Sequence, residues 1–129
     1  MTERTTIKLE TKDGIALLTL NRPEVLNSIN TTLLADVREA VAEVAANDEA
    51  RVLVITGAGR GFCAGADLAA QGSRPAGMTV GQGVAHGMEI GFNPMMRELH
   101  ELKKPIICAV NGTTAGGGVG LALVADIVI

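Results

Sequence analysis

Two stretches of the chain decide the fold: residues 52–68 read V-L-V-I-T-G-A-G-R-G-F-C-A-G-A-D-L, and residues 106–129 read I-I-C-A-V-N-G-T-T-A-G-G-G-V-G-L-A-L-V-A-D-I-V-I. In each stretch an apolar run typical of a buried strand is followed by glycine and alanine. Glycine permits unusual dihedral angles and has no side chain, so each segment can present bare backbone N–H groups. Ligands in α/β folds bind at such strand ends, which makes both segments candidate parts of a site.

The second stretch contains a triplet, Gly116-Gly117-Gly118, at the predicted start of the small-residue helix 119–125. Unpaired N–H groups and the positive end of the helix macrodipole favour developing negative charge at such a start. Taken alone, the triplet is better explained as a tight turn that permits close helix packing. Because a similar glycine segment lies upstream at residues 57–68, we instead favour a functional role for the triplet.

The flanking sequence predicts an α/β domain with the order β-β-α-β-loop-α-β-α-β and no internal repeat. Asp13-Gly14 between two apolar runs predicts a β-hairpin over residues 7–20. A following helix, capped by Asn30 or Thr31, is predicted by apolar residues at helical spacing, namely Leu33, Leu34, Val37, Val41 and Val44.

A change of character follows from Gln71 to Phe92, where six glycines occur in 22 residues. This stretch lacks a sustained period and predicts a flexible loop or lid over about residues 71–92. A second helix is predicted to begin at Asn93-Pro94 and to end at Lys103-Lys104-Pro105, before a strand over residues 106–110.

The composition of the 129 residues, 47% hydrophobic and 19% charged, is that of one soluble globular domain. The net charge of -3, with 11 basic and 14 acidic residues, excludes a basic surface for nucleic acid or an anionic membrane. No apolar run reaches the ~18 residues of a membrane span. Cys63 and Cys108 lack metal-site or disulfide spacing, so a cytoplasmic location is expected.

Three segments in the right order resemble the crotonase superfamily, which is the enoyl-CoA hydratase/isomerase family. Residues 52–68 resemble its first oxyanion segment and residues 106–129 its second, while Asn21-Arg22-Pro23 with Asn27-Ser28-Ile29-Asn30 resembles its early signature. The resemblance spans almost all 129 residues and implies the crotonase-like ββα spiral fold. Residues 1–129 would be the N-terminal part of a single domain, truncated before its C-terminal half, because the chain ends within a predicted buried strand.

The resemblance also implies a site in which the backbone N–H groups of Ala66 and Gly117 form an oxyanion hole for a thioester carbonyl oxygen. One such donor is worth roughly 3–4 kcal/mol of transition-state stabilisation. The residues expected to line the acyl and coenzyme A sites, partly through their main chain, are Val25, Asn27, Ala64, Gly65, Asp67 and Leu68.

One position departs from the family pattern. Family hydratases use two glutamates, of which the first lies three residues after the oxyanion glycine, where this chain has Gly120. Glycine cannot hold a water molecule or transfer a proton. Family isomerases use a single downstream carboxylate, which would lie beyond Ile129. We therefore expect double-bond isomerisation of an acyl-CoA in fatty acid metabolism, with a hydratase that does not use two acids, or an inactive acyl-CoA-binding relative, as alternatives.

The resemblance further implies an acyl-CoA thioester as the partner and a homotrimer or hexamer when the protein is full length, whereas the 129 residues alone would be poorly active. No nucleic acid, membrane or metal is expected to bind. No separate cofactor is expected either, because coenzyme A is part of the substrate.

Several other residues have a structural interpretation that competes with a functional one. Asp67 is better explained as a helix cap than as a catalytic acid. His86 and Glu89 could transfer protons, but solvated loop positions are favoured. Cys63 has no neighbouring base to activate it, so packing is favoured for Cys63 and for Cys108. A structural hydrogen bond is expected for Asp126.

A nicotinamide-dependent reductase is the remaining alternative, because residues 56–61 imitate a dinucleotide-binding turn. The full pattern would need glycine in place of Cys63, and such a turn normally follows the first strand. The chain also has no tyrosine to act as the usual proton donor.

Overall fold

The computed structural model, which describes residues 3–70 and 75–129, begins with the predicted hairpin. Strands β1 (Ile7–Lys12) and β2 (Ile15–Leu20) pair antiparallel. Asp13 and Gly14 join them with φ angles of 53° and 83°. Two-residue hairpin turns require such positive φ angles because their twist matches that of the strands.

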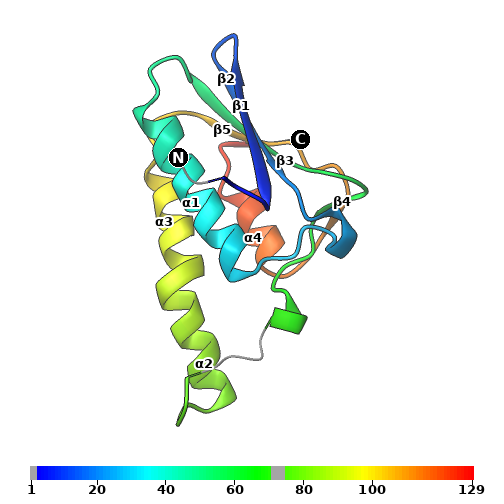
Figure 1. Cartoon of the computed structure of the whole chain (residues 1–129). Helices are drawn as coiled ribbons and strands as arrows, with labels where there is room; N and C mark the ends of the chain where they lie inside the picture. The colour runs from blue at the N-terminus through cyan, green and yellow to red at the C-terminus, as the bar shows by residue number, and fades with distance from the viewer. Residues whose placement is uncertain (1–2, 71–74) are drawn as a thin grey trace.

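The hairpin forms one edge of a five-stranded sheet with the order β1-β2-β3-β5-β7 (Figure 1). The other neighbouring strands of this sheet, β2 and β3, β3 and β5, and β5 and β7, pair parallel. A separate parallel pair, β4 and β6, lies at the end of the sheet where the two glycine segments meet. The bounds of these strands are β3 Val52–Gly57, β4 Gly61–Cys63, β5 Ile106–Cys108, β6 Thr113–Thr114 and β7 Ile127–Val128.

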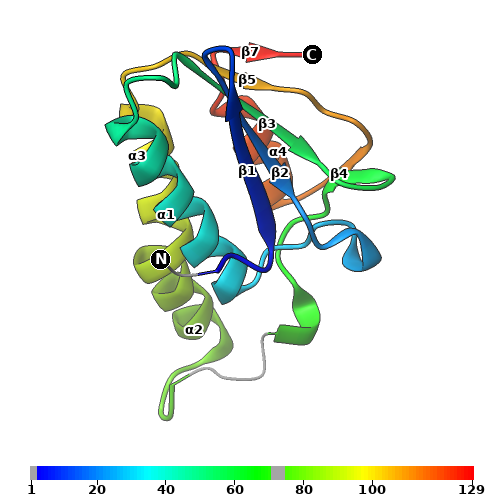
Figure 2. The ribbon, with the colours of Figure 1, turned by 45° about the horizontal axis from the view of Figure 1, so that its top comes forward.

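Helix α1 (Thr31–Ala46) covers one side of this sheet and lies beside α3 (Asn93–Glu101), as Figures 1 and 2 show. The side chain of Asn30 caps α1 by accepting the N–H of Leu33 at 2.8 Å, which confirms the predicted cap. The buried core consists mainly of aliphatic side chains from α1, the central strands, α3 and α4 (Gly117–Leu123). The opposite face of β3 is only partly covered, since Val52 and Val54 are half-buried, so the expected burial on both sides is not reached within the described residues.

The largest departure from the sequence prediction is that residues 80–92 are helical and do not form a loop. Helix α2 (Val80–Gly87) continues through a π-helical turn, η3 (Met88–Phe92), into α3 without a break before Asn93-Pro94. Thr79 starts the helix with a capping box: its hydroxyl accepts the N–H of Gln82 at 3.2 Å, and its own N–H donates to Gln82 Oε1 at 2.9 Å. Residues 71–74 of the predicted loop lie outside the described residues.

The π-helical turn explains how the helix accommodates both proline and glycine. Pro94 has no N–H for a regular helical bond, and the turn before it is widened, with the N–H of Asn93 reaching back to Met88 O. A β-carbon at Gly91 would lie 2.8 Å from Leu34 Cδ1, so glycine there permits η3 to press against α1. Gly91 thus lies within a helix against Leu34, and the sequence pattern alone does not distinguish such a position from a flexible loop.

No helix within the described ranges combines the length and the apolar character that crossing a membrane requires.

Candidate active site

The first glycine segment is fixed by a parallel bridge to the chain just before α1. Ile29 donates its N–H to Gly65 O at 2.7 Å, and Ile29 O accepts the N–H of Asp67 at 2.9 Å. Because the peptide between Gly65 and Ala66 is planar and trans, the Ala66 N–H points opposite to the bonded Gly65 carbonyl, away from Ile29. Ala66 is exposed, and no group within residues 3–70 and 75–129 accepts a hydrogen bond from its N–H.

The second glycine segment turns sharply into α4. Gly116 has φ 53° and ψ −128°, a conformation that L side chains rarely adopt. The N–H groups of Gly118 and Val119 donate to Ala115 O and Gly116 O at 2.9 and 3.0 Å. The N–H of Gly117 has no acceptor in the described part of the chain, as expected for the first residue of a helix.

The two segments touch each other through their glycines. A β-carbon at Gly65 would lie 2.8 Å from Ala115 O and 3.3 Å from Gly117 N, while one at Gly118 would lie 2.1 Å from Cys63 O. Real β-carbons essentially never come within 3.0 Å of such atoms, so the contact requires glycine at both positions. The close approach places two unpaired amides, of Ala66 and Gly117, in directly adjoining segments.

The immediate surroundings of the second amide are apolar. A β-carbon at Gly117 would lie 3.2 Å from Phe92 Cε2 and 3.4 Å from Ile29 Cδ1. Apolar side chains lower the local dielectric, which strengthens the interaction of an amide donor with a developing negative charge. The arrangement can therefore polarise an oxygen atom placed against it.

Comparison with known proteins identifies the family of this fold. A family model described as Enoyl-CoA hydratase/isomerase matches residues 10–129. The chain belongs to the enoyl-CoA hydratase/isomerase family. This match leaves no support for the nicotinamide-dependent reductase alternative.

Individual members of the enoyl-CoA hydratase/isomerase family show the extent of the likeness. The 1,2-epoxyphenylacetyl-CoA isomerase of Escherichia coli is 49% identical over 116 residues, which cover 90% of this chain and 44% of the relative. The short-chain-enoyl-CoA hydratase of Clostridium acetobutylicum is 36% identical over 126 residues, which cover 97% and 46%. The chain thus spans about half the length of the curated relatives it matches.

Solved structures of the family share the fold. A crystal structure of enoyl-CoA hydratase from Bacillus anthracis matches with a TM-score of 0.84 and 32% identity, covering 96% of this chain and 46% of that one. The crotonase-like α/β fold predicted from the sequence is therefore confirmed.

Asn27, predicted to lie near coenzyme A, is fully buried in this family member. Its Oδ1 accepts the N–H of Arg22 at 2.8 Å, and its Nδ2 donates to Ala58 O and Gly61 O, each at 3.0 Å. The side chain thus ties the turn after β2 to the loop after β3. Burial argues against direct contact between Asn27 and a ligand, so we correct its predicted role to support of that turn.

Of the other predicted ligand-contacting residues, Gly65 is buried, and the rest remain accessible to different degrees. Val25 and Leu68 are exposed, at 39% and 78%, and could each offer an apolar contact. Ala64 is half-buried and donates its N–H to Leu26 O at 3.0 Å. Asp67 is half-buried, and its Oδ1 accepts the N–H of Ala69 at 3.0 Å, which agrees with the predicted cap of a short helix, η2 (Leu68–Ala70).

Two polar residues that support the glycine segments had no predicted role. Arg22 forms an ion pair with Asp67, and the side chain of Asn111 donates to Gly59 O and Gly61 O at 3.0 and 3.2 Å. Both belong to the quoted family segments, and a polar residue directly after a strand is a signal for such a role. Their partners lie 45 to 52 residues away in the chain, and nothing in the local pattern names them.

The cysteines are placed for packing. Both are buried and free. Burial raises the pKa of Cys63, despite the opposing hydrogen bond to the Gly65 backbone, and burial raises the pKa of Cys108 to about 11. A thiol with a raised pKa is protonated at neutral pH and is a poor nucleophile.

The predicted acid/base candidates lie on helices. His86 is half-buried on α2, while Glu89 is exposed on η3. Asp126 accepts the N–H of Ile106 at 2.8 Å, which confirms its structural role. Within the described ranges no three His, Cys, Asp or Glu side chains gather closely enough to hold a metal ion.

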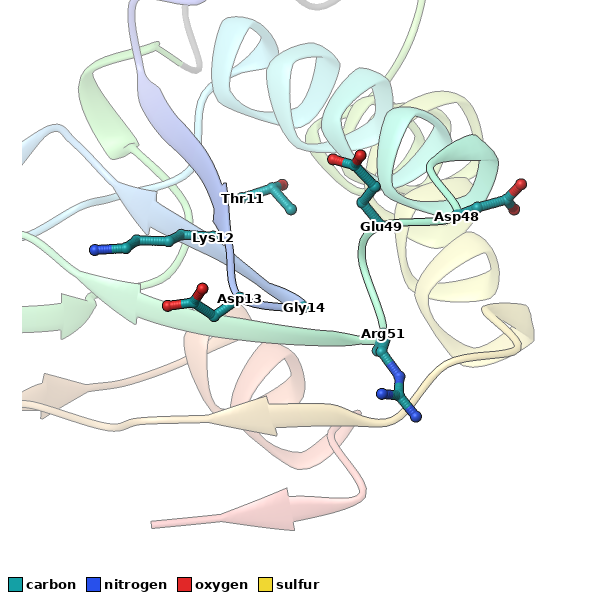
Figure 3. Close-up of a pocket in the computed structure, with 7 residues that line it drawn as sticks. All are labelled: Thr11, Lys12, Asp13, Gly14, Asp48, Glu49 and Arg51. Atoms are coloured by element: carbon teal, nitrogen blue, oxygen red, sulfur yellow. The ribbon is translucent and has the colours of Figure 1, made fainter.

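A cavity of about 390 Å³ lies far from these segments, at the hairpin tip (Figure 3). Its lining consists of Thr11, Lys12, Asp13, Gly14, Asp48, Glu49 and Arg51. Strands β2 and β3 both start at this end and run parallel toward the glycine segments, so the length of the sheet separates the cavity from Ala66 and Gly117. The cavity is therefore not part of the candidate site.

Proposed function

We propose that the complete protein carrying this chain binds an acyl-CoA thioester and stabilises its enolate with the backbone N–H groups of Ala66 and Gly117. The observation that carries this proposal is that two amides without acceptors lie in segments packed glycine against glycine. Val25, Ala64, Asp67 and Leu68 are proposed to line the bound substrate, with the buried Gly65 behind them.

Electrostatics give the reason for such a pair of donors. Removing a proton next to a thioester moves negative charge onto the carbonyl oxygen, and each fixed donor contributes roughly 3–4 kcal/mol at the transition state. The donors act without reorganisation because the bridge to Ile29 and the start of α4 hold them in place. Phe92 and Ile29 lie against Gly117 and make its surroundings apolar.

We further propose double-bond isomerisation with a single carboxylate from outside these residues. A β-carbon at Gly120 would lie 3.7 Å from Phe92 Cζ and 3.9 Å from Met96 Cε, which are ordinary contacts. Space does not forbid a side chain there, so glycine at this position favours chemistry with one acid over chemistry with two. The relative that is 49% identical is named as an isomerase of an epoxyphenylacetyl-CoA, which supports isomerisation of an acyl-CoA in general and not a double-bond shift in particular.

A mass measurement tests the proposal. The complete protein is incubated with an enoyl-CoA in deuterated water, and the product is analysed by mass spectrometry. An isomerase moves the double bond without adding water and incorporates deuterium to the extent that its carboxylate exchanges protons with solvent, so chromatography of the product resolves the new isomer. A hydratase adds one water molecule, and an inactive relative binds the thioester unchanged. Failure to bind any acyl-CoA would refute the proposal.

The 129-residue chain, assayed beside the complete protein, tests the missing acid. Turnover by the complete protein alone is expected, and robust turnover by the short chain would contradict an acid outside it.

We propose that residues 1–129 form the N-terminal part of one domain in a cytoplasmic homotrimer or hexamer. Ultracentrifugation of the complete protein would check its oligomeric state.

A further inference from the structure

We propose that the ion pair between Arg22 and Asp67 aims the Ala66 amide into the oxyanion hole, which makes both residues positioning residues for the reaction. This inference rests on the proposed function above. It assigns a catalytic consequence to two side chains that do not themselves touch the reacting atoms.

The contacts of Arg22 span the bridge that orients Ala66. Arg22 Nη2 lies 3.0 Å from Asp67 Oδ2, and its Nη1 donates to Ser28 O at 2.7 Å. Ser28 directly precedes Ile29, and Asp67 directly follows Ala66. One guanidinium group therefore links both strands of the Ile29–Ala66 bridge beside the donor.

The bonds around Asp67 show why this link affects direction. Its backbone N–H is bonded to Ile29 O, and its Oδ1 accepts the N–H of Ala69. Since the direction of the Ala66 N–H follows from the bond between Ile29 and Gly65, any shift of one strand against the other turns the donor away. A displacement of about 1 Å at a positioned group can cost about a hundredfold in rate.

Charge gives the pair a second effect. The two side chains are only 17% and 13% exposed, so little solvent screens them. The carboxylate of Asp67 is one residue from a donor that must stabilise negative charge, and Arg22 offsets the resulting repulsion. Removing Arg22 should therefore weaken enolate stabilisation more than neutralising Asp67 does, and neutralising both should restore part of the loss.

A pair of ligands isolates this effect in the complete protein. One ligand is an unreactive saturated acyl-CoA thioester, and the other is the matching thioether, in which a methylene group replaces the carbonyl. The ratio of their dissociation constants measures the contribution of the carbonyl oxygen. Asp67→Asn is expected to reduce the preference for the thioester over the thioether about tenfold and to lower kcat by a similar factor. Arg22→Gln should reduce both by more, up to the hundredfold scale of a misplaced group. The affinity for the thioether should stay unchanged in both variants.

The matched control is Glu98→Gln, which removes the ion pair between Arg38 and Glu98 on α1 and α3. Neither the affinity ratio nor kcat should change in this variant, because the pair lies outside the glycine segments. If Asp67→Asn does not fold by circular dichroism, Arg22→Lys tests the same link, since lysine keeps the charge but lacks the two-armed geometry.

The outcomes separate the two proposals. If the unaltered protein binds thioester and thioether equally well, the oxyanion hole and the proposed function fail together. If it prefers the thioester and folded Asp67→Asn and Arg22→Gln keep both that preference and kcat, the positioning role is overturned while the function stands. An equal loss of affinity for both ligands would also overturn it, because a purely structural role predicts that result.

Discussion

The two glycine segments are held in place by different means. Side chains from elsewhere bind the backbone of the first segment, notably the buried Asn27 and the exposed Asn111. Within the described residues, no side chain from another segment forms a hydrogen bond with the backbone of residues 112–120. That segment is instead seated by contacts that leave no room for a β-carbon, at Gly112 (2.0 Å from Arg60 O) and Gly118 (2.1 Å from Cys63 O).

The two halves of the proposed oxyanion hole should therefore respond to different kinds of substitution. The first segment depends on polar partners, so deleting a distant side chain should loosen it. The second has no such side-chain partner among the described residues: its Ala115 N–H donates to Cys63 O at 3.1 Å, and its close contacts require glycine, as the contact of Gly65 does in the first segment. Adding a single methyl group should therefore displace it. Substitutions of each kind test whether the two segments differ in this way.

The largest effect is expected for Gly117→Pro, which removes the donor N–H. Proline is tolerated at the first position of a helix, where the N–H has no helical partner. Turnover by the complete protein should fall at least about a hundredfold, the scale of one lost oxyanion donor. Gly117→Ala is the matched control, because it adds a β-carbon against Phe92 while keeping the N–H. Equal turnover of folded proline and alanine variants would remove Gly117 from the site.

Gly118→Ala should be the most damaging change to stability. The added methyl would lie 2.1 Å from Cys63 O, and backbone must move to admit it. We expect a loss of about 3 kcal/mol or more in the free energy of unfolding, at the upper end of overpacking costs. Urea denaturation of the complete protein measures this loss, and an unchanged midpoint would show that the second segment is not seated by close contact.

Asn27→Ala should destabilise the first segment by about 2 kcal/mol, because buried carbonyl and amide groups lose their partners. Asn111→Ala removes contacts to the same loop at an exposed position, where water can replace them. Its cost should be about 1 kcal/mol or less. The same denaturation experiment compares the two, and equal costs would contradict the assignment of Asn27 as the buried support.

The smallest effect is expected for Gly120→Ala, one turn into α4. A β-carbon there meets only ordinary contacts with Phe92 and Met96. Alanine is favoured over glycine inside a helix by about 1 kcal/mol, so thermal melting should show equal or greater stability. A marked loss, comparable with that of Gly118→Ala, would show that the whole glycine run is seated by contact and not Gly118 alone.

Local sequence was a good guide where short-range bonds decide the structure. The Asp13-Gly14 turn and the Asn30 cap each depend on neighbours within a few residues, and both were predicted. The helix after the glycine triplet was also predicted, but it begins at Gly117 and ends at Leu123, two residues earlier at each end than the predicted range 119–125. The prediction was wrong for residues 80–92. Glycines suggested a loop there, but a capping box and packing of Gly91 against Leu34 favour a helix.

The class of the fold, the family and the two segments that offer bare amides could be predicted from the amino-acid sequence, because an apolar strand followed by glycine is a pattern of neighbouring residues. The distant groups that hold those amides became evident only in the folded chain. Arg22 and Asp67 are 45 residues apart, and Gly118 meets Cys63 across a similar gap. Such contacts depend on how strands and helices pack in space, and they cannot be predicted from the spacing of residue types along the chain.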